Sequence, residues 1–227
     1  MRIGILGTGS VGRTLASKLT ELDHEVRIGT RDVQALLGRT ERGADGSLPF
    51  AEWRVSNPGV EVGTFEEAAA GAEVVINATS GSVSLDALRA AGEANLDGKV
   101  LIDISNPLDF SQGFPPSLSV VNTDSLAEQI QRAFPGARVV KTLNTVSAYV
   151  MIDAGSVGGG DHHVFLSGND AGAKAEVDGH LREWFGWRNV LDLGDITTAR
   201  GPEMLLALWV RLLGVFGNGN FNLKVVT

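Results

Sequence analysis

The chain has 227 residues, of which 43% are hydrophobic and 20% charged, and its formal net charge is −8 at pH 7. A chain of this length can bury the core of one compact domain, so we expect a single unit over residues 1–227. An acidic chain without a lysine- or arginine-rich run lacks the electrostatic footprint of a nucleic-acid or anionic-membrane partner, and neither is expected. Because the chain contains no cysteine, disulfides, zinc fingers and a catalytic thiol are excluded.

The two ends of the sequence bear on its location. Met1 and Arg2 lead directly into the first apolar run, which leaves no room for a cleavable signal. The longest apolar stretch, over residues 204–216, is interrupted by Arg211. We therefore expect a cytoplasmic protein without a membrane-spanning segment.

The strongest motif lies in the first part of the chain. Residues 3–6 are apolar and enter GTGSVG, residues 7–12, and apolar residues at helical spacing follow over residues 14–22. This order predicts the strand, glycine turn and helix start that bind a dinucleotide pyrophosphate. Gly7 permits the tight turn, Gly9 lets the backbone approach the phosphates, and Gly12 lets the helix pack close to the strand. A tight turn without a ligand is the alternative.

The second strand, over residues 25–28, ends in a sequence that indicates which dinucleotide is bound. An NAD site usually places an acidic residue here for the ribose 2′-hydroxyl, whereas a 2′-phosphate needs a hydroxyl and a guanidinium. Thr30 and Arg31 supply that pair, so NADP is the predicted cofactor. Asp32 is expected to be a first-turn acid of the next helix. The alternative makes Arg31 a solvated surface charge.

Strands and helices alternate along the rest of the chain, as a parallel sheet with covered faces requires. A helix over residues 32–37 precedes a polar loop over residues 38–59, in which Trp53 is expected to be an anchor, with a lid residue as the alternative. Further strands are predicted over residues 60–62, 73–78, 99–104, 138–143, 164–167 and 189–193. Further helices are predicted over residues 65–70, 84–91, 125–134, 171–185 and 202–215. The predicted fold is α/β, a Rossmann-type doubly wound, mostly parallel sheet with a core of about 1–150 and a small C-terminal α/β extension of about 151–227.

Polar residues follow three of the strands, at the edge where doubly wound sheets bind ligands. The fourth strand leads into residues 77–82, NATSGS, whose hydroxyls suit ribose and pyrophosphate, with a helix cap at Ser82 or Ser84 as the alternative. The fifth leads into residues 103–109, DISNPLD, where Leu108 can offer an apolar face to nicotinamide, with a simple turn as the alternative. The sixth leads into residues 141–148, KTLNTVSA, near which a second ring would stack.

These residue types favour hydride transfer between two rings, for which the protein supplies positioning rather than an acid or base. The single tyrosine, Tyr149, has no lysine four residues later, which weakens a carbonyl-reductase interpretation. No metal is predicted. His162 and His163 are neighbours whose side chains face opposite ways in a strand. His24 is expected to be a turn residue before the second strand, and His180 has no partner histidine at helical spacing.

The motifs GTGSVG, GTR, SNPLD, KTLNTVSA, SGND, DLGDITTARG and FNLKVV together resemble the NADP oxidoreductases that use the deazaflavin coenzyme F420. They are also similar to the NADPH-oxidising domain of the six-transmembrane metalloreductases. The resemblance covers nearly the whole chain apart from residues 38–59. At the position of Asn144 the F420 enzymes carry histidine and the metalloreductase domains carry asparagine.

The resemblance implies a set of site residues. NADP would be held by the glycine turn and by Thr8, Ser10, Val11, Thr30 and Arg31, and the nicotinamide would be bordered by Thr79, Pro107 and Leu108. From the residues themselves, Ser80 and Asn106 are also predicted to bind the cofactor, and the slot for a hydride acceptor is predicted at Pro107, Leu108, Asn144 and Ala148.

The implied function is hydride transfer between NADP(H) and F420 or a flavin-like acceptor. An NADPH-dependent flavin or ferric-chelate reductase and a non-catalytic NADPH-sensing module are the alternatives. Residues 204–216 are apolar almost all round, so this helix is expected to be buried, either in a homodimer, which the resemblance implies, or within the monomer. The resemblance also implies that Phe221, Asn222 and Lys224 pack near the cofactor cleft.

Overall fold

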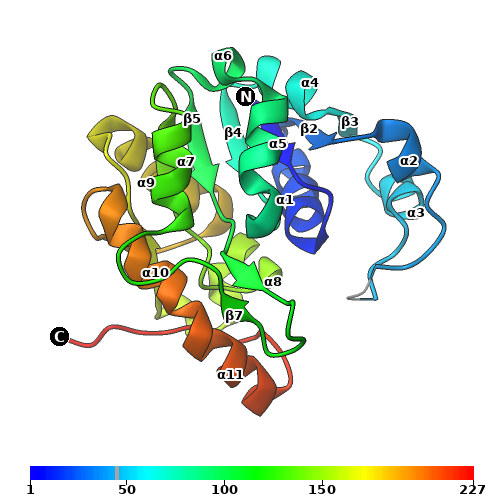
Figure 1. Ribbon diagram of the computed structural model, residues 1–227. Coiled ribbons are helices and arrows are strands. Elements are labelled where there is room, and N and C mark those ends of the chain that lie inside the picture. The colour runs from blue at the N-terminus through cyan, green and yellow to red at the C-terminus, as the bar shows by residue number, and fades with distance from the viewer. Residues whose placement is uncertain (44–45) are drawn as a thin grey trace.

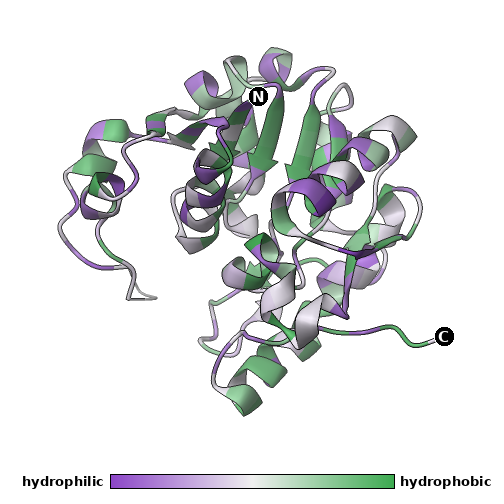
Figure 2. Cartoon of the chain, turned by 180° about the vertical axis from the view of Figure 1, so that it is seen from behind, coloured by the Kyte–Doolittle hydropathy of each residue, from purple (hydrophilic) through white to green (hydrophobic). Residues whose placement is uncertain are grey.

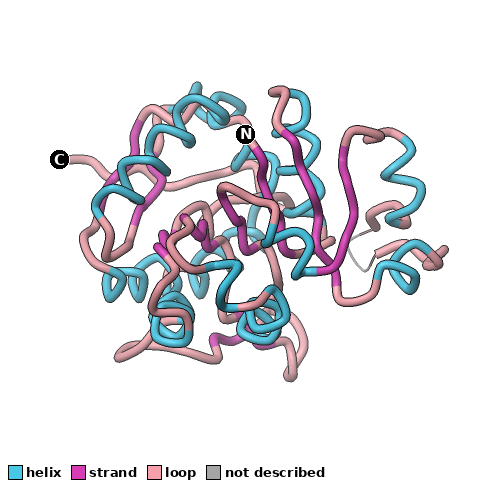
Figure 3. Tube along the Cα trace, turned by 90° about the horizontal axis from the view of Figure 1, so that it is seen from above, coloured by secondary structure: helices cyan, strands magenta, loops and turns pink. Residues whose placement is uncertain are grey.

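The computed structural model describes residues 1–43 and 46–227, which form a six-stranded parallel sheet with helices on both faces (Figure 1; Figure 3 gives the view from above). The sheet has the order β3-β2-β1-β4-β5-β8. Its strands are β1 (Arg2–Leu6), β2 (Glu25–Thr30), β3 (Val60–Thr64), β4 (Val74–Asn77), β5 (Val100–Asp103) and β8 (Arg138–Lys141). The strand order reverses between β1 and β4, which is the point where doubly wound sheets bind ligands. The predicted Rossmann-type fold is confirmed.

Alternate residues along the strands supply two cores. Ile3 and Ile5 face helices α1 (Ser10–Glu21), α8 (Ala148–Ile152) and α9 (Ala171–Phe185), whereas Leu6 belongs to the core on the other face. That second core includes helices α4 (Phe65–Ala70), α5 (Ser84–Ala91) and α7 (Leu126–Ala133), with the short α6 (Glu93–Leu96) beside them. Strands buried on both faces read as continuous apolar runs, which is why β1, β4 and β5 were predictable.

The C-terminal extension packs mainly on the first of these cores, whereas its residues Ile196 and Ala199 belong to the second. It contains the parallel pair β9 (His163–Leu166) and β10 (Asn189–Asp192), helix α9, and the helices α10 (Arg200–Met204) and α11 (Leu206–Phe216). Val177 and Leu181 of α9 are buried with Ile76 and Ile102 of the sheet. This shared core supports our proposal that residues 1–227 are one domain. Single 3₁₀ turns occupy Gly81–Val83, Ala154–Ser156, Gly158–Gly160 and Ile196–Ala199.

The segment expected as a polar loop over residues 38–59 is partly helical. After α2 (Val33–Leu37), helix α3 (Phe50–Val55) forms, and both helices stand out beside β3 (Figure 1). Trp53 lies on α3 with its ring 5.1 Å from that of Phe50, so it is an anchor as predicted, although of a helix. A run of six residues that buries only Phe50 carries too little periodicity to reveal a helix. Residues 44 and 45 of the predicted loop lie outside the described residues.

The C-terminal helix also differs from the prediction. The expected helix over residues 202–215 is divided at Leu205 into α10 and α11, and α11 buries only Leu206 and Val210 within this chain. Leu208, Val215 and Phe216 are exposed, and Figure 2 shows α11 as a strongly hydrophobic element at one end of the molecule. Burial within the monomer is therefore wrong for this face of the helix. No described helix is both long and apolar enough to cross a membrane.

The remaining chain between β5 and α7 forms a small hairpin, β6 (Leu108–Asp109) with β7 (Ser117–Leu118), where the sequence predicts no strand. A buried ion cluster lies at the carboxyl ends of β5 and β8. The ammonium group of Lys141 lies 2.8 Å from Asp103 and 2.9 Å from Glu203, and all three side chains are at most 1% exposed. Burial alone would lower the pKa of Lys141, but the charges of Asp103 and Glu203 outweigh it and raise this pKa.

Replacing the buried cation tests how much this cluster stabilises the fold. Lys141→Ala leaves two buried carboxylates without their counterion, so we expect the free energy of unfolding to fall by about 3–5 kcal/mol. Urea unfolding measures the change. The control is Arg89→Ala, which breaks an exposed pair with Asp86 and should have a far smaller effect. Equal losses in the two variants would contradict the stabilising role of the cluster.

Candidate functional site

The glycine turn between β1 and α1 has a different geometry at each glycine. Gly7 has a φ of +123°, and a Cβ there would lie 2.5 Å from the carbonyl oxygen of Ala78. A Cβ at Gly12 would lie 2.2 Å from the carbonyl oxygen of Gly7. By contrast, a Cβ at Gly9 would meet nothing within 4 Å, so Gly9 borders open space. The turn and the close helix packing that the sequence predicts are therefore present.

Helix α1 starts at this turn with its amide groups unoccupied by side chains. Gly9 is its N-cap and makes no side-chain cap, and the first turn holds no acidic residue. The N-terminus of a helix carries a partial positive charge and free N–H donors, both of which favour an anion. The open space at Gly9 gives an anion access to these donors.

A groove of about 440 Å³ runs from the turn past the end of β2, and we call it the first groove. Its wall includes Thr8, Thr30, Arg31, Asp32 and Arg39. The Asp32 carboxylate is the N-cap of α2 and accepts a hydrogen bond from the Ala35 amide at 2.9 Å, so its charge serves the helix. It is a cap, one position before the first helical turn in which it was predicted.

Two cations line the first groove, and sequence analysis found only one of them. Arg31 comes directly after β2, whereas Arg39 follows the end of α2 and borders the groove from there. Arg39 lies in a segment with no recognisable pattern, so only its charge could have pointed to it.

A second groove of about 230 Å³ continues on the other side of the turn. It is lined by Ser10, Val11, Asn106 and Leu108, and by Phe110, whose side chain is 57% exposed. Gly9, Ala78, Thr79 and Ser80 border both grooves and so mark the place where they meet. Phe110 was missed because a single aromatic residue in a proline- and glycine-rich loop has no distinguishing pattern.

The residues predicted for the acceptor slot do not all face the second groove. Leu108 lines it, Pro107 is buried, and Ala148 is the half-buried first residue of α8. Asn144 is 4% exposed, and its amide donates to the side chain of Asn106 and to the carbonyl oxygen of Pro202, each at 3.0 Å. Asn144 therefore holds α10 against the loop that follows β5.

The serine residues after β4 are not caps of α5. Helix α5 has no side-chain cap, and the hydroxyl of Ser84 lies instead 2.8 Å from that of Thr79. The hydroxyl of Ser82 lies 3.2 Å from that of Ser80. The alternative of an ordinary helix cap at Ser82 or Ser84 is wrong.

Histidines take structural positions. His162 is buried and lies 2.9 Å from the carbonyl oxygen of Ala154 and 2.7 Å from the side chain of Asn222. His180 stacks on Trp184, and burial lowers the pKa of both His180 and His24. In the part of the chain that the structure describes, no three acidic, histidine or cysteine residues gather as metal ligands.

The C-terminal residues lie beside the extension. Asn222 contacts His162 and His163, Lys224 pairs with Asp161 at 2.6 Å, and Phe221 packs on Trp209 and Phe216. These contacts involve the extension, and neither groove is lined by the three residues.

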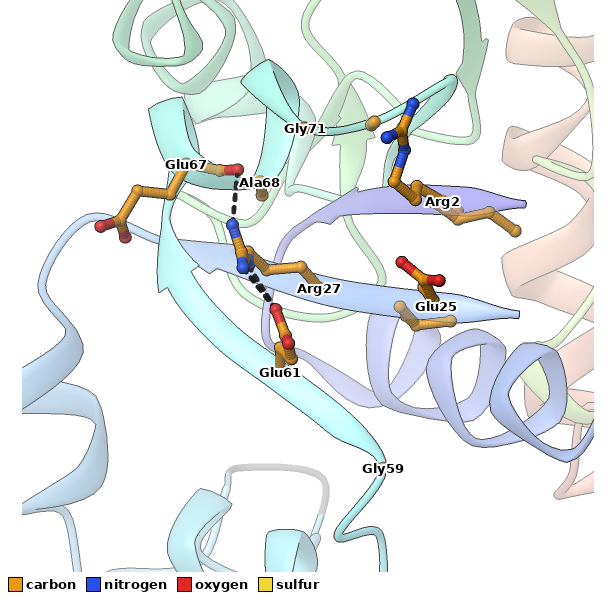
Figure 4. A pocket seen from close by; sticks show the side chains of 11 residues that line it. Arg2, Glu25, Arg27, Gly59, Glu61, Glu67, Ala68 and Gly71 are labelled. Atoms are coloured by element: carbon orange, nitrogen blue, oxygen red, sulfur yellow. Dashed lines mark hydrogen bonds and ion pairs between the residues drawn. The ribbon is translucent and has the colours of Figure 1, made fainter. Parts of the chain in front are cut away.

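A separate pocket of about 160 Å³ lies at the opposite edge of the sheet, where β1, β2 and β3 begin (Figure 4). Arg27 crosses it and donates to the carboxylate of Glu61 at 2.9 Å and to the carbonyl oxygen of Glu67 at 3.2 Å. Because its cation is already paired and it lies far from the glycine turn, this pocket is not part of the site.

The site thus combines an open helix N-terminus, two guanidinium groups and hydroxyls along one continuous depression with an apolar end. Comparison with known proteins identifies relatives of this chain. The family model for coenzyme F420-dependent NADP oxidoreductases matches residues 2–107. The F420-dependent NADP reductase of Methanothermobacter marburgensis is 30% identical over 216 residues, which cover 93% of this chain and 92% of that protein.

Two further relatives extend the comparison. A solved structure from Arthrobacter sp. FB24, provisionally described as an F420-dependent NADP reductase, is 57% identical over the full length of both chains, with a TM-score of 0.94. The rat metalloreductase STEAP3 is 29% identical over 212 residues, which cover 93% of this chain but 37% of that protein. The chain thus corresponds to 37% of the length of STEAP3.

Proposed function

Since the chain belongs to the family of coenzyme F420-dependent NADP oxidoreductases, we propose that it transfers hydride between NADP(H) and F420. The observation that carries this proposal is the pair of grooves that meet at the glycine turn, one cationic and one with apolar walls. A flavin in place of F420 is the second candidate, favoured by the asparagine at position 144 and by the similarity to STEAP3.

The first groove and the turn fit NADP by their donor chemistry. The free amide groups of α1 and the open space at Gly9 suit the pyrophosphate, with Thr8, Ser10, Val11 and Gly12 around it. The hydroxyl of Thr30 and the guanidinium groups of Arg31 and Arg39 suit the 2′-phosphate, because guanidinium binds phosphate through paired N–H donors. Asp32 does not oppose this, since its carboxylate is engaged by α2.

The second groove is proposed to hold the nicotinamide ring and the acceptor. When bound, the two rings supply the hydride donor and acceptor, so the chain contributes geometry and exclusion of water. Val11, Leu108 and Phe110 would form the apolar walls, and Thr79, Ser80 and Asn106 would border the nicotinamide. Pro107 is buried and would support Leu108 from behind. The acceptor slot is proposed beside Leu108, between the residue pair Asn106 and Asn144 and the start of α8 at Ala148.

Isotope transfer tests the reaction. NADPH deuterated stereospecifically at nicotinamide C4 should deliver its label to C5 of F420 without exchange with water, as direct hydride transfer requires. Mass spectrometry of the reduced F420 measures the label. In a parallel reaction flavin mononucleotide replaces F420, and the oxidation of NADPH is measured. Ala148→Trp should depress turnover strongly while the NADPH affinity stays within several-fold. Protein that binds NADPH but oxidises it with neither acceptor would favour the sensing module instead.

Arg31 should determine the preference for NADPH over NADH. Arg31→Ala removes a charge-assisted contact with the 2′-phosphate, which is typically worth about 1.5–3 kcal/mol, or roughly one to two orders of magnitude in affinity. Calorimetry should show weaker NADPH binding and nearly unchanged NADH binding, and Arg39→Ala should act in the same direction. Arg54→Ala, at an exposed arginine of α3, is the control. Equal affinities of the unaltered protein for the two cofactors would contradict a role of Arg31 in cofactor preference.

Gly9 should matter for binding and little for stability. Gly9→Val places a side chain in open space, so the melting temperature without ligand should change by only about 2–4 °C. The same side chain occupies phosphate space, so NADPH and NADH binding should be lost together. Gly179→Val, at an exposed glycine of α9 whose Cβ also meets nothing, should leave binding intact. Wild-type NADPH affinity in Gly9→Val would contradict pyrophosphate binding at the turn.

The exposed face of α11 supports a homodimer, in which Leu208, Val215 and Phe216 are covered by a second copy. Light scattering should then give twice the monomer mass, and Leu208→Glu should return the protein to monomers. A monomer at micromolar concentration in the unaltered protein would argue against the dimer. The predicted cytoplasmic location stays a prediction.

A further inference from the structure

A chain of hydrogen bonds links the buried cation Lys141 to the place where the two grooves meet. The Lys141 ammonium lies 2.8 Å from Asp103 Oδ2, and both side chains are fully buried. Asp103 Oδ1 accepts from Asn77 Nδ2 at 2.9 Å, and Asn77 Oδ1 accepts from the Thr79 hydroxyl at 2.6 Å. The path crosses the sheet from β8 through β5 to the end of β4.

The chemistry of the groups fixes the direction of every bond in this path. A carboxylate paired with Lys141 can only accept, and Asp103 indeed accepts from the amide and hydroxyl of Ser105 as well. The side-chain amide of Asn77 must therefore turn its NH₂ group toward Asp103. Its oxygen then faces Thr79, which has one proton to give. The Thr79 hydroxyl donates that proton into the protein.

Ser84 closes the remaining options. Its hydroxyl lies 2.8 Å from that of Thr79 and accepts from Asn77 Nδ2 at 3.2 Å. Because the Thr79 proton is already committed, the proton of Ser84 is directed either to Thr79 or to the carbonyl oxygen of Ser80, which lies 3.3 Å away. A hydroxyl oxygen has two lone pairs, so at least one lone pair of Thr79 remains. Thr79 is partly buried and borders both grooves.

We propose that Lys141, Asp103 and Asn77 are positioning residues that hold Thr79 as a hydrogen-bond acceptor, so that Thr79 binds a donor group of the nicotinamide nucleoside. This inference rests on the proposed NADP function. The pyrophosphate carries only acceptors and cannot satisfy Thr79. Two groups of the nucleoside can, namely a ribose hydroxyl and the carboxamide NH₂. The buried ion pair thereby determines, through Asn77, that Thr79 accepts a hydrogen bond from the cofactor and does not donate one.

Three ligands separate the possible donors. 2′,5′-ADP lacks the whole nicotinamide nucleoside, 2′-phospho-ADP-ribose adds the second ribose, and NADP⁺ adds the nicotinamide. Calorimetry with Thr79→Val should show unchanged 2′,5′-ADP binding and about 2- to 12-fold weaker NADP⁺ binding, the range for one net hydrogen bond. Weaker 2′-phospho-ADP-ribose binding assigns the ribose hydroxyl, and a loss confined to NADP⁺ assigns the carboxamide. Unchanged NADP⁺ binding, or an equal loss for 2′,5′-ADP, overturns the proposal.

Further variants distinguish polarity from shape. Thr79→Ser keeps the hydroxyl and should bind like the unaltered protein, and Thr20→Val, at an unpaired hydroxyl of α1, is the matched control. Asn77→Leu frees the Thr79 proton, so NADP⁺ should weaken relative to 2′,5′-ADP although Thr79 is present. Asn77→Ser provides the same test if the leucine variant does not melt cooperatively. A selective effect absent from both Asn77 variants overturns the positioning role. If the unaltered protein binds NADP⁺ no more tightly than it binds 2′,5′-ADP, the proposed function fails instead.

Discussion

The ammonium group of Lys141 neutralises two carboxylates that come from different parts of the chain, and the arrangement of the site depends on this contact. Asp103 ends strand β5, whereas Glu203 belongs to α10, 100 residues further along. Glu203 also accepts hydrogen bonds from the amides of Leu126 and Ala127 at 2.7 and 3.0 Å, at the start of α7. One buried cation therefore holds together the sheet, a helix of the Rossmann core and the C-terminal extension. The desolvation of three charges is offset because each carboxylate has several partners.

This arrangement explains why the two halves of the site differ in character. The half proposed for NADP is made from the glycine turn between β1 and α1 and from the end of β2, where local sequence determines the backbone. The half proposed for the acceptor depends on contacts between distant segments, such as that of Asn144 with Asn106 and with Pro202. The matched family model ends at residue 107, which is close to the boundary between the two halves.

The sequence predicted those parts of the structure that are determined by residues close together in the chain. Gly7 and Gly12 were predictable because only glycine tolerates the turn and the close helix approach. Buried strands such as β4 were predictable from their apolar runs. Arg39, Phe110 and helix α3 were not, because each depends on where a short irregular segment folds back. The apolar helix α11 was predicted in type, but pattern alone does not say whether its partner is the same chain or another.

Asp103 and Lys141 also show that the sequence does not reveal which distant residues a side chain contacts. Both were noted as ends of strands, yet neither was assigned a role, since a charged residue in a strand gives no sign of its partner. Burial of a charge requires a counterion, and only the tertiary structure reveals that Glu203 completes the set. Sequence patterns therefore locate the edge of the sheet that binds ligands, whereas the polar groups that organise it emerge only from the packing.

Arg13 joins the glycine turn to the helix α3. It donates to the carbonyl oxygen of Thr8 at 2.8 Å and to that of Leu48, and its guanidinium lies 5.1 Å from the ring centre of Phe50 and 5.9 Å from that of Trp53. Indole fluorescence responds to a nearby charge. The other three tryptophans lie elsewhere, Trp184 and Trp187 in the core and Trp209 on α11 against Phe221. Trp53 is consequently a built-in optical reporter: any movement of the turn that shifts Arg13 alters the emission of a residue that does not itself border either groove.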